Sequence, residues 1–217
     1  MPLPHPMIFR DMEQEEYDGL RAGGYIRTAD YPKGAAVFRT GDVTAELGVL
    51  QSGEIHIETT DLWGNRMILH NITPGQCFGE TYAFCGAPMM VDVTAVQDTR
   101  VLFLSLGGAL DRANRGESWY PKLLHNLLLL STEKNLAWSN RVLCISAKHI
   151  RTRVMRYLSA EAVRRGTTEF TIPFDRQQMA DYLNVERSAL SKELGRMERE
   201  GILTFRKNHF RLHRTEV

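Results

Sequence analysis

Cysteine is scarce in this chain of 217 residues, which holds three of them at irregular spacing. Cys77, Cys85 and Cys144 form no C-x-x-C pair, and an odd number cannot be fully paired within one chain. A disulfide framework or a zinc site uses paired cysteines at characteristic spacings. The sequence therefore argues against both, and we expect buried, reduced thiols and no metal site.

Long apolar runs are also missing. No stretch approaches the roughly 20 residues needed to span a membrane, and the first residues, MPLPHPMIFRD, lack the basic and then apolar pattern of a secretion signal. With 43% hydrophobic and 24% charged residues, the composition is that of a soluble globular protein with room for two modest domains. We therefore expect a cytoplasmic protein that does not bind membranes.

Charge is unevenly distributed, although the net charge is only +1. Residues 146–217 hold 15 Lys and Arg against 9 Asp and Glu, whereas residues 1–145 hold 12 against 17. A basic segment attracts a polyanion, although a surplus of this size is weak evidence by itself. The C-terminal part is therefore the candidate for binding nucleic acid.

Short alternating segments punctuated by turns fill residues 25–104, and many short strands with frequent turns predict an antiparallel sandwich or small barrel. The pattern includes turns at Pro32-Lys33-Gly34, Thr40-Gly41-Asp42 and Trp63-Gly64-Asn65, and strands at 55–59, 91–96 and 100–104. Residues 77–88 interrupt it. We predict a jelly roll over residues 1–116, with an irregular insert that leaves room for a small ligand.

After Gly116 the apolar pattern becomes helical. Seven positions follow one another at spacings of four and three residues: Leu124, Leu128, Ser131, Asn135, Trp138, Val142 and Ile145. Such a heptad seam predicts a long helix from Trp119 to Ile145, within a central segment of residues 117–145, that pairs with a second copy. Asn135 supports a two-stranded dimer, because a single Asn in a seam costs stability but fixes the register. A helix packed within its own subunit is the alternative.

The stretch from Asp175 to Gly201 predicts a helix-turn-helix. Asp175 and Gln178 can form a capping box at the start of the first helix. Asn184 tolerates the left-handed conformation of a turn, and Gly201 suits the end of the second helix. A β-hairpin pattern follows over residues 202–212, which makes the motif a winged helix.

Basic and hydroxyl side chains remain on the exposed face at the start of the second helix. They suit the major groove of double-stranded DNA, where Arg and Lys donate to guanine and Ser adapts to either partner. A helical hairpin with solvated charges is the alternative. We assign residues 146–217 to DNA binding, with Ser146 capping a helix over 147–165 and a hinge at Ile145-Ser146. The predicted DNA contacts are Arg176, Arg187, Ser188, Ser191 and Lys192.

The order of these parts resembles the Crp/Fnr superfamily of bacterial transcription regulators over essentially the whole chain. The matching pieces are Lys33-Gly34, Gly41-Asp42, Leu50 to Gly53, Pro74-Gly75, Phe78-Gly79-Glu80 and the segment Arg187 to Lys192. The resemblance implies an α+β fold with a cyclic-nucleotide-binding-like jelly roll, a long dimerisation helix and a C-terminal winged helix-turn-helix. It also implies a homodimer that binds a two-fold symmetric operator, responds to a signal in the roll and works with RNA polymerase.

The resemblance further implies an effector site at the insert and the facing helix. Members that bind cyclic AMP carry an Arg-Ser pair shortly after the Gly-Glu, where this chain has Met89-Met90. Without a guanidinium to offset its lost hydration, a phosphate is poorly held. We therefore do not expect cyclic AMP, and a small apolar or aromatic molecule with one polar group fits better. The candidate effector residues are Phe78, Gly79, Glu80, Thr81, Met89, Met90, Thr132 and Asn135.

The superfamily also contains oxygen sensors and haem sensors. Their cofactors need residues that this chain lacks or has only as single candidates. Oxygen-sensing members hold an iron–sulfur cluster on four cysteines, and this chain has three. Haem-sensing members need a Cys or His axial ligand, although a single buried Cys or His is more often packed in a core. The candidates here are Cys77, Cys85, His56 and His70. Ser188 and Lys192 replace the Glu and Arg common in the superfamily, so familiar operator sequences do not transfer.

Two functions compete with that of an effector-responsive regulator. A cupin-type metalloenzyme needs convergent His and carboxylate ligands, typically an H-x-H pair, and this roll has His56-Ile57-Glu58 instead. We therefore expect no enzymatic activity. A constitutive DNA-binding protein, with a vestigial pocket closed by Met89 and Met90, remains compatible with the sequence.

Overall fold

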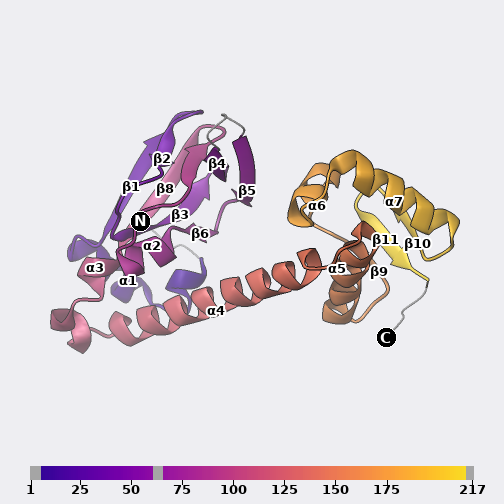
Figure 1. Ribbon diagram of the computed structural model, residues 1–217. Coiled ribbons are helices and arrows are strands. Elements are labelled where there is room, and N and C mark those ends of the chain that lie inside the picture. Colours follow the sequence, from indigo (N-terminus) through magenta and orange to yellow (C-terminus); the bar gives the residue numbers. More distant parts are fainter. Residues whose placement is uncertain (1–5, 61–65, 214–217) are drawn as a thin grey trace. The chain divides into compact units, whose positions relative to one another are not determined.

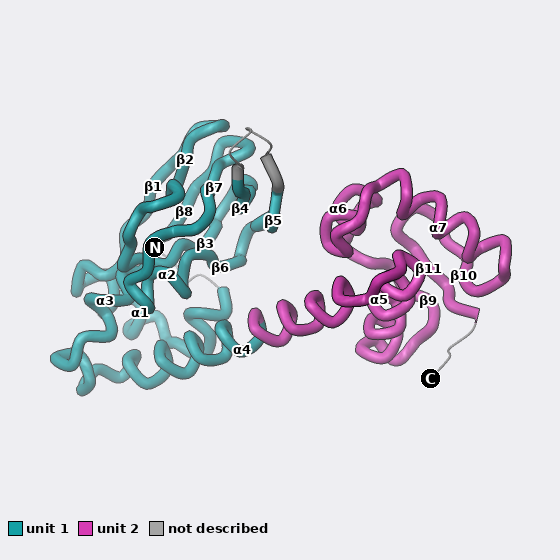
Figure 2. Tube along the Cα trace, viewed as in Figure 1, with its two compact units in different colours: residues 1–133 teal, residues 134–217 magenta. Residues whose placement is uncertain are grey.

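The computed structural model describes residues 6–60 and 66–213 (Figure 1), so the predicted turn Trp63-Gly64-Asn65 lies outside the described residues. The chain forms two compact units, one up to Glu133 and the other from Lys134 (Figure 2). The division falls inside α4 (Trp119–Ile145), the long helix predicted from the heptad spacing. Each unit has its own hydrophobic core.

Two antiparallel sheets form the roll of the first unit. Within the described residues, one sheet has the strand order β1-β8-β3-β6 and the other β2-β7-β4-β5. This arrangement confirms the jelly roll predicted for the N-terminal part. The strands are β1 (Ile26–Tyr31), β2 (Ala36–Phe38), β3 (Glu46–Ser52), β4 (Ile55–Thr60), β5 (Arg66–Ile72), β6 (Cys77–Phe78), β7 (Asp92–Ala95) and β8 (Thr99–Ser105).

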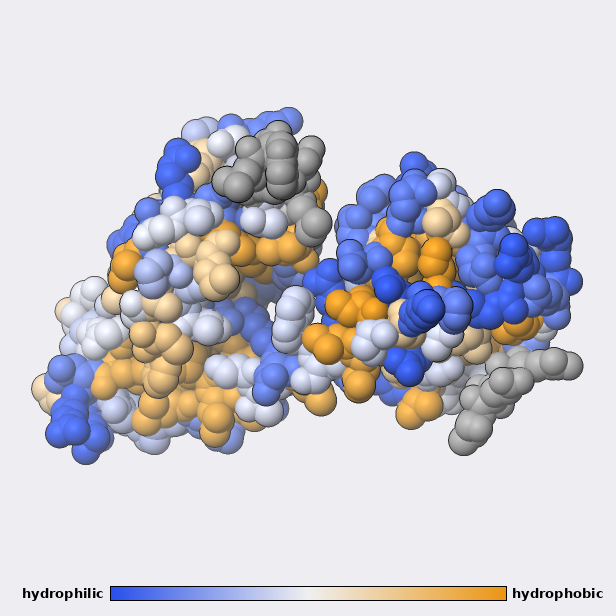
Figure 3. Space-filling view, in the orientation of Figure 1, coloured by the Kyte–Doolittle hydropathy of each residue, from blue (hydrophilic) through white to orange (hydrophobic). Residues whose placement is uncertain are grey.

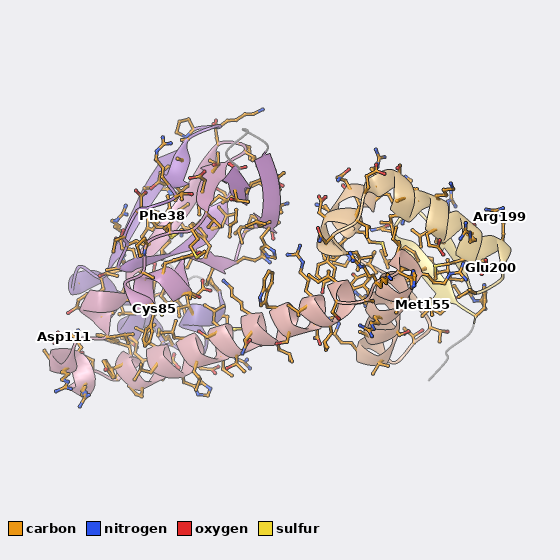
Figure 4. All side chains as sticks on the ribbon, in the orientation of Figure 1. Phe38, Cys85, Asp111, Met155, Arg199 and Glu200 are labelled. Carbon is orange, nitrogen blue, oxygen red and sulfur yellow. The ribbon has the colours of Figure 1, made fainter. Side chains whose placement is uncertain are left out.

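Aromatic side chains pack in the core of the roll, among them Phe38, which Figure 4 labels. The ring of Phe38 lies 6.1 Å from that of Phe78 and 5.8 Å from that of Phe103, both edge to face. Met89 joins this cluster and is 2% exposed. Gly48 is needed opposite them, because a Cβ there would lie 2.3 Å from the Phe78 ring. Phe78, within the insert, and Met89, just after it, therefore belong to the core.

Helical segments complete the first unit. The insert contains α2, which starts after Gly79 in the left-handed conformation that glycine tolerates (φ 79°). The N-terminal helix α1 begins with a capping box formed by Glu13 and Glu16. The helices besides α4 are η1 (Met7–Phe9), α1 (Gln14–Ala22), α2 (Glu80–Cys85), α3 (Leu106–Ala109) and η2 (Arg112–Gly116).

A partly buried ion pair ties α1 to α4. The carboxylate of Glu16 is 9% exposed and accepts from the Nζ of Lys122 at 2.7 Å. Burial disfavours the ionised form of Glu16, but hydrogen bonds from Lys122 and the Glu13 backbone outweigh it and lower its pKa. Nearby, buried Asn126 donates to two backbone carbonyls of the N-terminal segment. These contacts fix the first half of α4 to its own unit.

Replacing Lys122 with methionine is expected to lower the free energy of unfolding by about 1.5–3 kcal/mol, because the Glu16 carboxylate loses its charged donor. Since the folded-state pKa of Glu16 lies below its usual value, this contribution exists at neutral pH and is lost as the pH falls through that pKa. Urea denaturation followed by circular dichroism measures the change. As a control, replacing Arg21 with methionine removes only an exposed pair with Asp18 and should cost less than about 1 kcal/mol. Equal losses in both variants would contradict a special role for the partly buried pair.

The second unit is a winged helix. Its sheet has the order β10-β11-β9, so the short strand β9 extends the hairpin that the sequence predicts. The sequence pattern assigns residues 168–173 only to a connection and does not predict β9. The elements are α5 (Ile150–Arg165), β9 (Glu169–Thr171), α6 (Arg176–Tyr182), α7 (Arg187–Arg199), β10 (Leu203–Arg206) and β11 (His209–Leu212).

The start of α5 corrects one prediction. The helix begins at Ile150 with His149 at the N-cap position, not at Ala147 with Ser146 as its cap. The hydroxyl of Ser146 instead donates to the Leu143 carbonyl oxygen at 3.0 Å. Ser146 therefore closes the end of α4, because a hydroxyl can satisfy a free helix carbonyl as readily as it can cap a new helix.

Three arginines brace the junction between α4, α5 and α6. Arg156 donates to the carbonyl oxygen of Leu143 at 2.7 Å, at the end of α4. Arg153 joins the carbonyl oxygens of Ala147 and of two residues after α6, and Arg141 reaches the last residues of α6 from α4. A guanidinium at a helix C-terminus satisfies free carbonyls and opposes the negative end of the dipole. The hinge predicted at Ile145-Ser146 is thus heavily braced.

Candidate nucleic-acid interface

The helix-turn-helix forms as its sequence predicts. Asp175 and Gln178 make reciprocal hydrogen bonds of 2.8 and 2.9 Å at the start of α6. Asn184 takes a left-handed conformation in the turn (φ 51°), and Gly201 does the same after α7 (φ 69°). These local signals are strong because each depends on one side chain and its neighbouring backbone.

The two faces of α7 differ sharply. Leu190, Leu194 and Met197 are completely buried and pack against the core of the unit. The side chains on the opposite face, at its N-terminal half, are exposed: Arg187, Ser188, Ser191 and Lys192. The structure therefore brings together four of the five predicted DNA contacts on one surface. In Figure 3 the visible face of the second unit is largely hydrophilic, with apolar patches between the hydrophilic regions.

Glu186 also belongs to this surface, although the sequence pattern predicts no role in DNA binding for it. Its carboxylate caps α7 by accepting from the backbone N–H and the hydroxyl of Ser188. These hydrogen bonds, the hydroxyl one foremost, lower the pKa of Glu186. The Ser188 hydroxyl must therefore leave this carboxylate before it can donate to a base. The sequence does contain a signal for this contact, because Glu186 stands at the start of the predicted second helix, two residues before Ser188.

Arg176, the fifth predicted contact, is on α6 and not on α7. It is half-buried at the first position of α6, and its Nη2 donates to the Lys207 carbonyl oxygen at 3.0 Å. Its guanidinium carbon also lies 4.9 Å from the ring centre of Phe205 and 5.8 Å from that of Phe210. The side chain is thus engaged with the wing.

The far end of α7 is anchored to α5. Arg151 donates to Glu193 at 2.7 Å and to both carboxylate oxygens of Glu200, at 2.7 and 3.0 Å. The Arg151 hydrogen bond is the main cause of the lowered pKa of Glu200, and the two carboxylates raise that of Arg151. A bidentate pair of this kind fixes direction as well as distance. It leaves the opposite, N-terminal end of α7 free to meet a ligand.

The predicted dimer seam on α4 is exposed in the single chain. Leu128 is 67% exposed and Trp138 is 58% exposed, and Leu124 and Val142 are also exposed apolar residues. Of the remaining seam positions, Ser131 and Asn135 are exposed and Ile145 is half-buried. Leu136 and Leu143 lie one residue after seam positions and are exposed as well. They widen the apolar surface beyond the heptad stripe that the sequence predicts.

The predicted effector residues divide into buried and exposed groups. Phe78, Met89 and Glu80 are buried, whereas Met90 is 76% exposed. Thr81 is exposed, and Gly79 lies between Phe78 and Glu80 at the start of α2. On α4, Thr132 donates to its own helix at the Leu128 carbonyl oxygen, and Asn135 belongs to the second unit. The structure thus brings the residues at the insert together, and two of them, Phe78 and Met89, belong to the hydrophobic core of the roll.

The candidate haem ligands are scattered. Cys77 is buried and Cys85 is exposed on α2 (Figure 4), while His56 lies 3.9 Å from the carboxylate of Glu54. His70 pairs with Ile57 across β4 and β5. Among residues 6–60 and 66–213 there is no group of three or more His, Cys, Asp or Glu that could hold a metal ion. Nor does any helix in the described part of the chain have the length and apolar character to cross a membrane.

Comparison with known families accounts for both units. A family model described as a cyclic nucleotide-binding domain matches residues 28–112, and one described as a Crp-like helix-turn-helix domain matches residues 152–216. The chain belongs to the Crp/Fnr superfamily of transcription regulators. DNA binding through the helix-turn-helix follows from this membership.

Individual proteins that resemble this chain in sequence or structure support this assignment. The chain is 26% identical to the cyclic AMP receptor protein of Thermus thermophilus, over 90% of this chain and 87% of that protein. Among solved structures, OCPA-complexed CprK has a TM-score of 0.68 at 20% identity and covers 91% of this chain and 92% of its own. The c-di-GMP-responsive regulator CLP of Xanthomonas campestris has a TM-score of 0.64 at 16% identity, covering 94% and 100%. The two structural matches show the shared fold.

Proposed function

We propose that this protein is a homodimeric, effector-responsive regulator that binds a two-fold symmetric DNA site in the cytoplasm. The observation that carries the proposal is the exposed face of α7, where Arg187, Ser191 and Lys192 project from a fully buried scaffold. Charged and hydroxyl side chains at the N-terminal half of a recognition helix can read base edges in the major groove. Fluorescence anisotropy with a duplex that the protein enriches from a random pool tests specific binding.

The exposed seam on α4 supports the homodimer. Large apolar side chains such as Leu128 and Trp138 are seldom exposed in a line on a helix unless a partner covers them. Members of the superfamily are dimers, and a symmetric dimer gives each recognition helix its own half-site. We further propose that the DNA-bound dimer contacts RNA polymerase.

The effector that we propose is a small apolar or aromatic molecule and not cyclic AMP. Met89-Met90 stands where a phosphate clamp would need a guanidinium, and thioethers give an anion no hydrogen-bond donor. The relatives bear names that refer to cyclic AMP, to c-di-GMP and to OCPA, which supports a roll that different proteins have adapted to different ligands. An effector can switch the protein only if it binds the two dimer states with different affinity.

Cyclic AMP is expected to show no heat of binding at micromolar concentrations in titration calorimetry. The missing charge-assisted clamp costs at least about 1.5–3 kcal/mol for each lost hydrogen bond, which weakens affinity tenfold or more per bond. The matched control replaces Glu80 with alanine. A micromolar dissociation constant that this replacement abolishes would restore nucleotide sensing. Mass spectrometry of the purified protein under native conditions identifies any other molecule that it carries.

A constitutive DNA-binding protein is the second candidate. The side chains of Phe78 and Met89 are 1% and 2% exposed within the core of the roll, which favours a filled pocket. In that case DNA affinity would be high without any added molecule. Equal operator affinity before and after extraction of small molecules by unfolding and refolding would favour this candidate.

A further inference from the structure

Arg176 links the first helix of the helix-turn-helix to the wing. Its Nη2 donates to the carbonyl oxygen of Lys207, which lies in the turn between β10 and β11. Its guanidinium also contacts Phe205 and Phe210, whose rings are stacked at 5.8 Å with an interplanar angle of 21°. An Arg over aromatic faces is stabilised by cation–π attraction, which is stronger where water is excluded. One side chain therefore touches both strands and the turn of the hairpin.

The turn that Arg176 holds is strained and carries charge. Lys207 has a φ of 56°, a left-handed conformation that costs about 1–2 kcal/mol for a residue with a side chain. The next residue, Asn208, is held from the other side, because its Nδ2 donates to the Ile172 carbonyl oxygen at 2.9 Å. Arg206 and Lys207 are exposed at this tip. The hairpin thus presents two cations at a position that internal contacts fix.

Arg176 occupies an unfavourable electrostatic position. It stands at the first position of α6, where the positive end of the helix dipole disfavours a cation. Partial burial lowers its pKa, and the nearby charge of Arg187 on α7 lowers it further. Other contacts must offset this electrostatic cost. The hydrogen bond to the Lys207 carbonyl oxygen and the contacts with the Phe205 and Phe210 rings do so, and all of them are with the wing.

We propose that Arg176 is a positioning residue that sets the wing turn, Lys207 and Asn208, at a fixed place relative to the recognition helix α7. It thereby determines whether the cations at the tip, Arg206 and Lys207, reach DNA phosphates while α7 lies in the groove. This inference rests on the proposed DNA binding and revises the role predicted for Arg176, from a direct DNA contact to a support for other contacts. Figure 1 shows the β10–β11 hairpin beside α7.

Replacing Arg176 with lysine separates the two roles. Lysine keeps the positive charge, so a direct phosphate contact would largely survive. It lacks the planar fork and cannot both donate to the Lys207 carbonyl and lie flat over the rings. If Arg176 positions the wing, R176K should weaken binding to the enriched duplex about tenfold, the loss expected for a hydrogen bond to a charged group. The matched control is R165K, because Arg165 lies over Phe170 at 5.7 Å but makes no contact with the turn that the structure records.

A thermodynamic cycle with the variant R206A/K207A identifies the route of the effect. If Arg176 acts through the wing, the loss caused by R176K should shrink to about twofold or less once both tip cations have been replaced with alanine. Hydrogen exchange should also be faster at the amides of residues 207–209 in R176K and unchanged in R165K. Circular dichroism against temperature establishes that each variant is folded in both binding experiments.

Three results would overturn the proposal. One is R176K affinity within about twofold of the unaltered protein, as expected of a simple charge contact. Another is full additivity of R176K with R206A/K207A, and the third is unchanged hydrogen exchange at the turn. Failure of the underlying function looks different: the unaltered protein would then bind the enriched duplex no better than random duplexes of equal length.

Discussion

Replacing Leu128 with aspartate is expected to convert the proposed dimer into monomers and to weaken DNA binding by two to four orders of magnitude. Leu128 is 67% exposed in the single chain, so a carboxylate there should leave the protomer folded. In a dimer it would be buried without a partner, which costs about 3–5 kcal/mol. Loss of the dimer removes the second half-site contact, whose avidity is worth about 10²–10⁴ in affinity.

Sedimentation velocity measures the assembly state of the variants. Trp138→Asp should behave like Leu128→Asp, since both positions lie in the same seam. Val163→Asp is the matched control, because Val163 on α5 is 84% exposed and lies off the seam. Dimers that persist in both seam variants would assign assembly to another surface.

Replacing Arg187 with alanine is expected to remove sequence preference more than overall affinity. A bidentate contact between Arg and guanine is worth about 1–3 kcal/mol of discrimination at each half-site. Binding to the enriched duplex should therefore weaken by this amount, while binding to a scrambled duplex of equal length should change much less. Fluorescence anisotropy on both duplexes measures the difference.

Arg199→Ala supplies the control for this experiment. Arg199 lies at the other end of α7 (Figure 4) and donates to the Gly195 carbonyl oxygen of its own helix. Its removal should leave the preference for the enriched duplex intact. If Arg187→Ala weakens both duplexes equally, Arg187 contacts phosphate and another residue reads the bases.

Features governed by neighbouring residues were predictable from the sequence. The capping box of Asp175 and Gln178, the left-handed Asn184 and the end of α7 before Gly201 all formed as expected. The bounds of α4 also matched, because a heptad seam repeats one signal many times. These elements fix the two-part architecture, which is why the superfamily resemblance could be recognised from residues alone.

Features governed by distant contacts were not predictable. Strand β9 is three residues long and exists because it pairs with β11. The same holds for Arg176, whose partners are about 30 residues away at Phe205, Lys207 and Phe210. In both cases local preference is weaker than tertiary packing. Ser146 is different, because its hydroxyl bonds locally to the Leu143 carbonyl oxygen, three residues earlier, and the sequence pattern does not decide between this bond and a helix cap.

The proposed effector site was predictable from the sequence only in part. The sequence located the insert and its Gly79-Glu80 turn, and α2 indeed starts there. It could not tell that the side chains of Phe78 and Met89 would be buried in the core, because burial depends on the aromatic residues of both sheets. The absence of a guanidinium at Met89-Met90 remains the stronger argument about ligand chemistry, since it depends only on which residues are present.

Selection of bound duplexes from a random pool, followed by sequencing, tests the central claim most directly. A homodimer that inserts two copies of α7 into successive major grooves should enrich an inverted repeat. The centres of its half-sites should lie about 10–10.5 base pairs apart, or a multiple of that, because the recognition helices must face the same side of the DNA. Enrichment of a single asymmetric element, or of no sequence at all, would contradict a two-fold symmetric regulator.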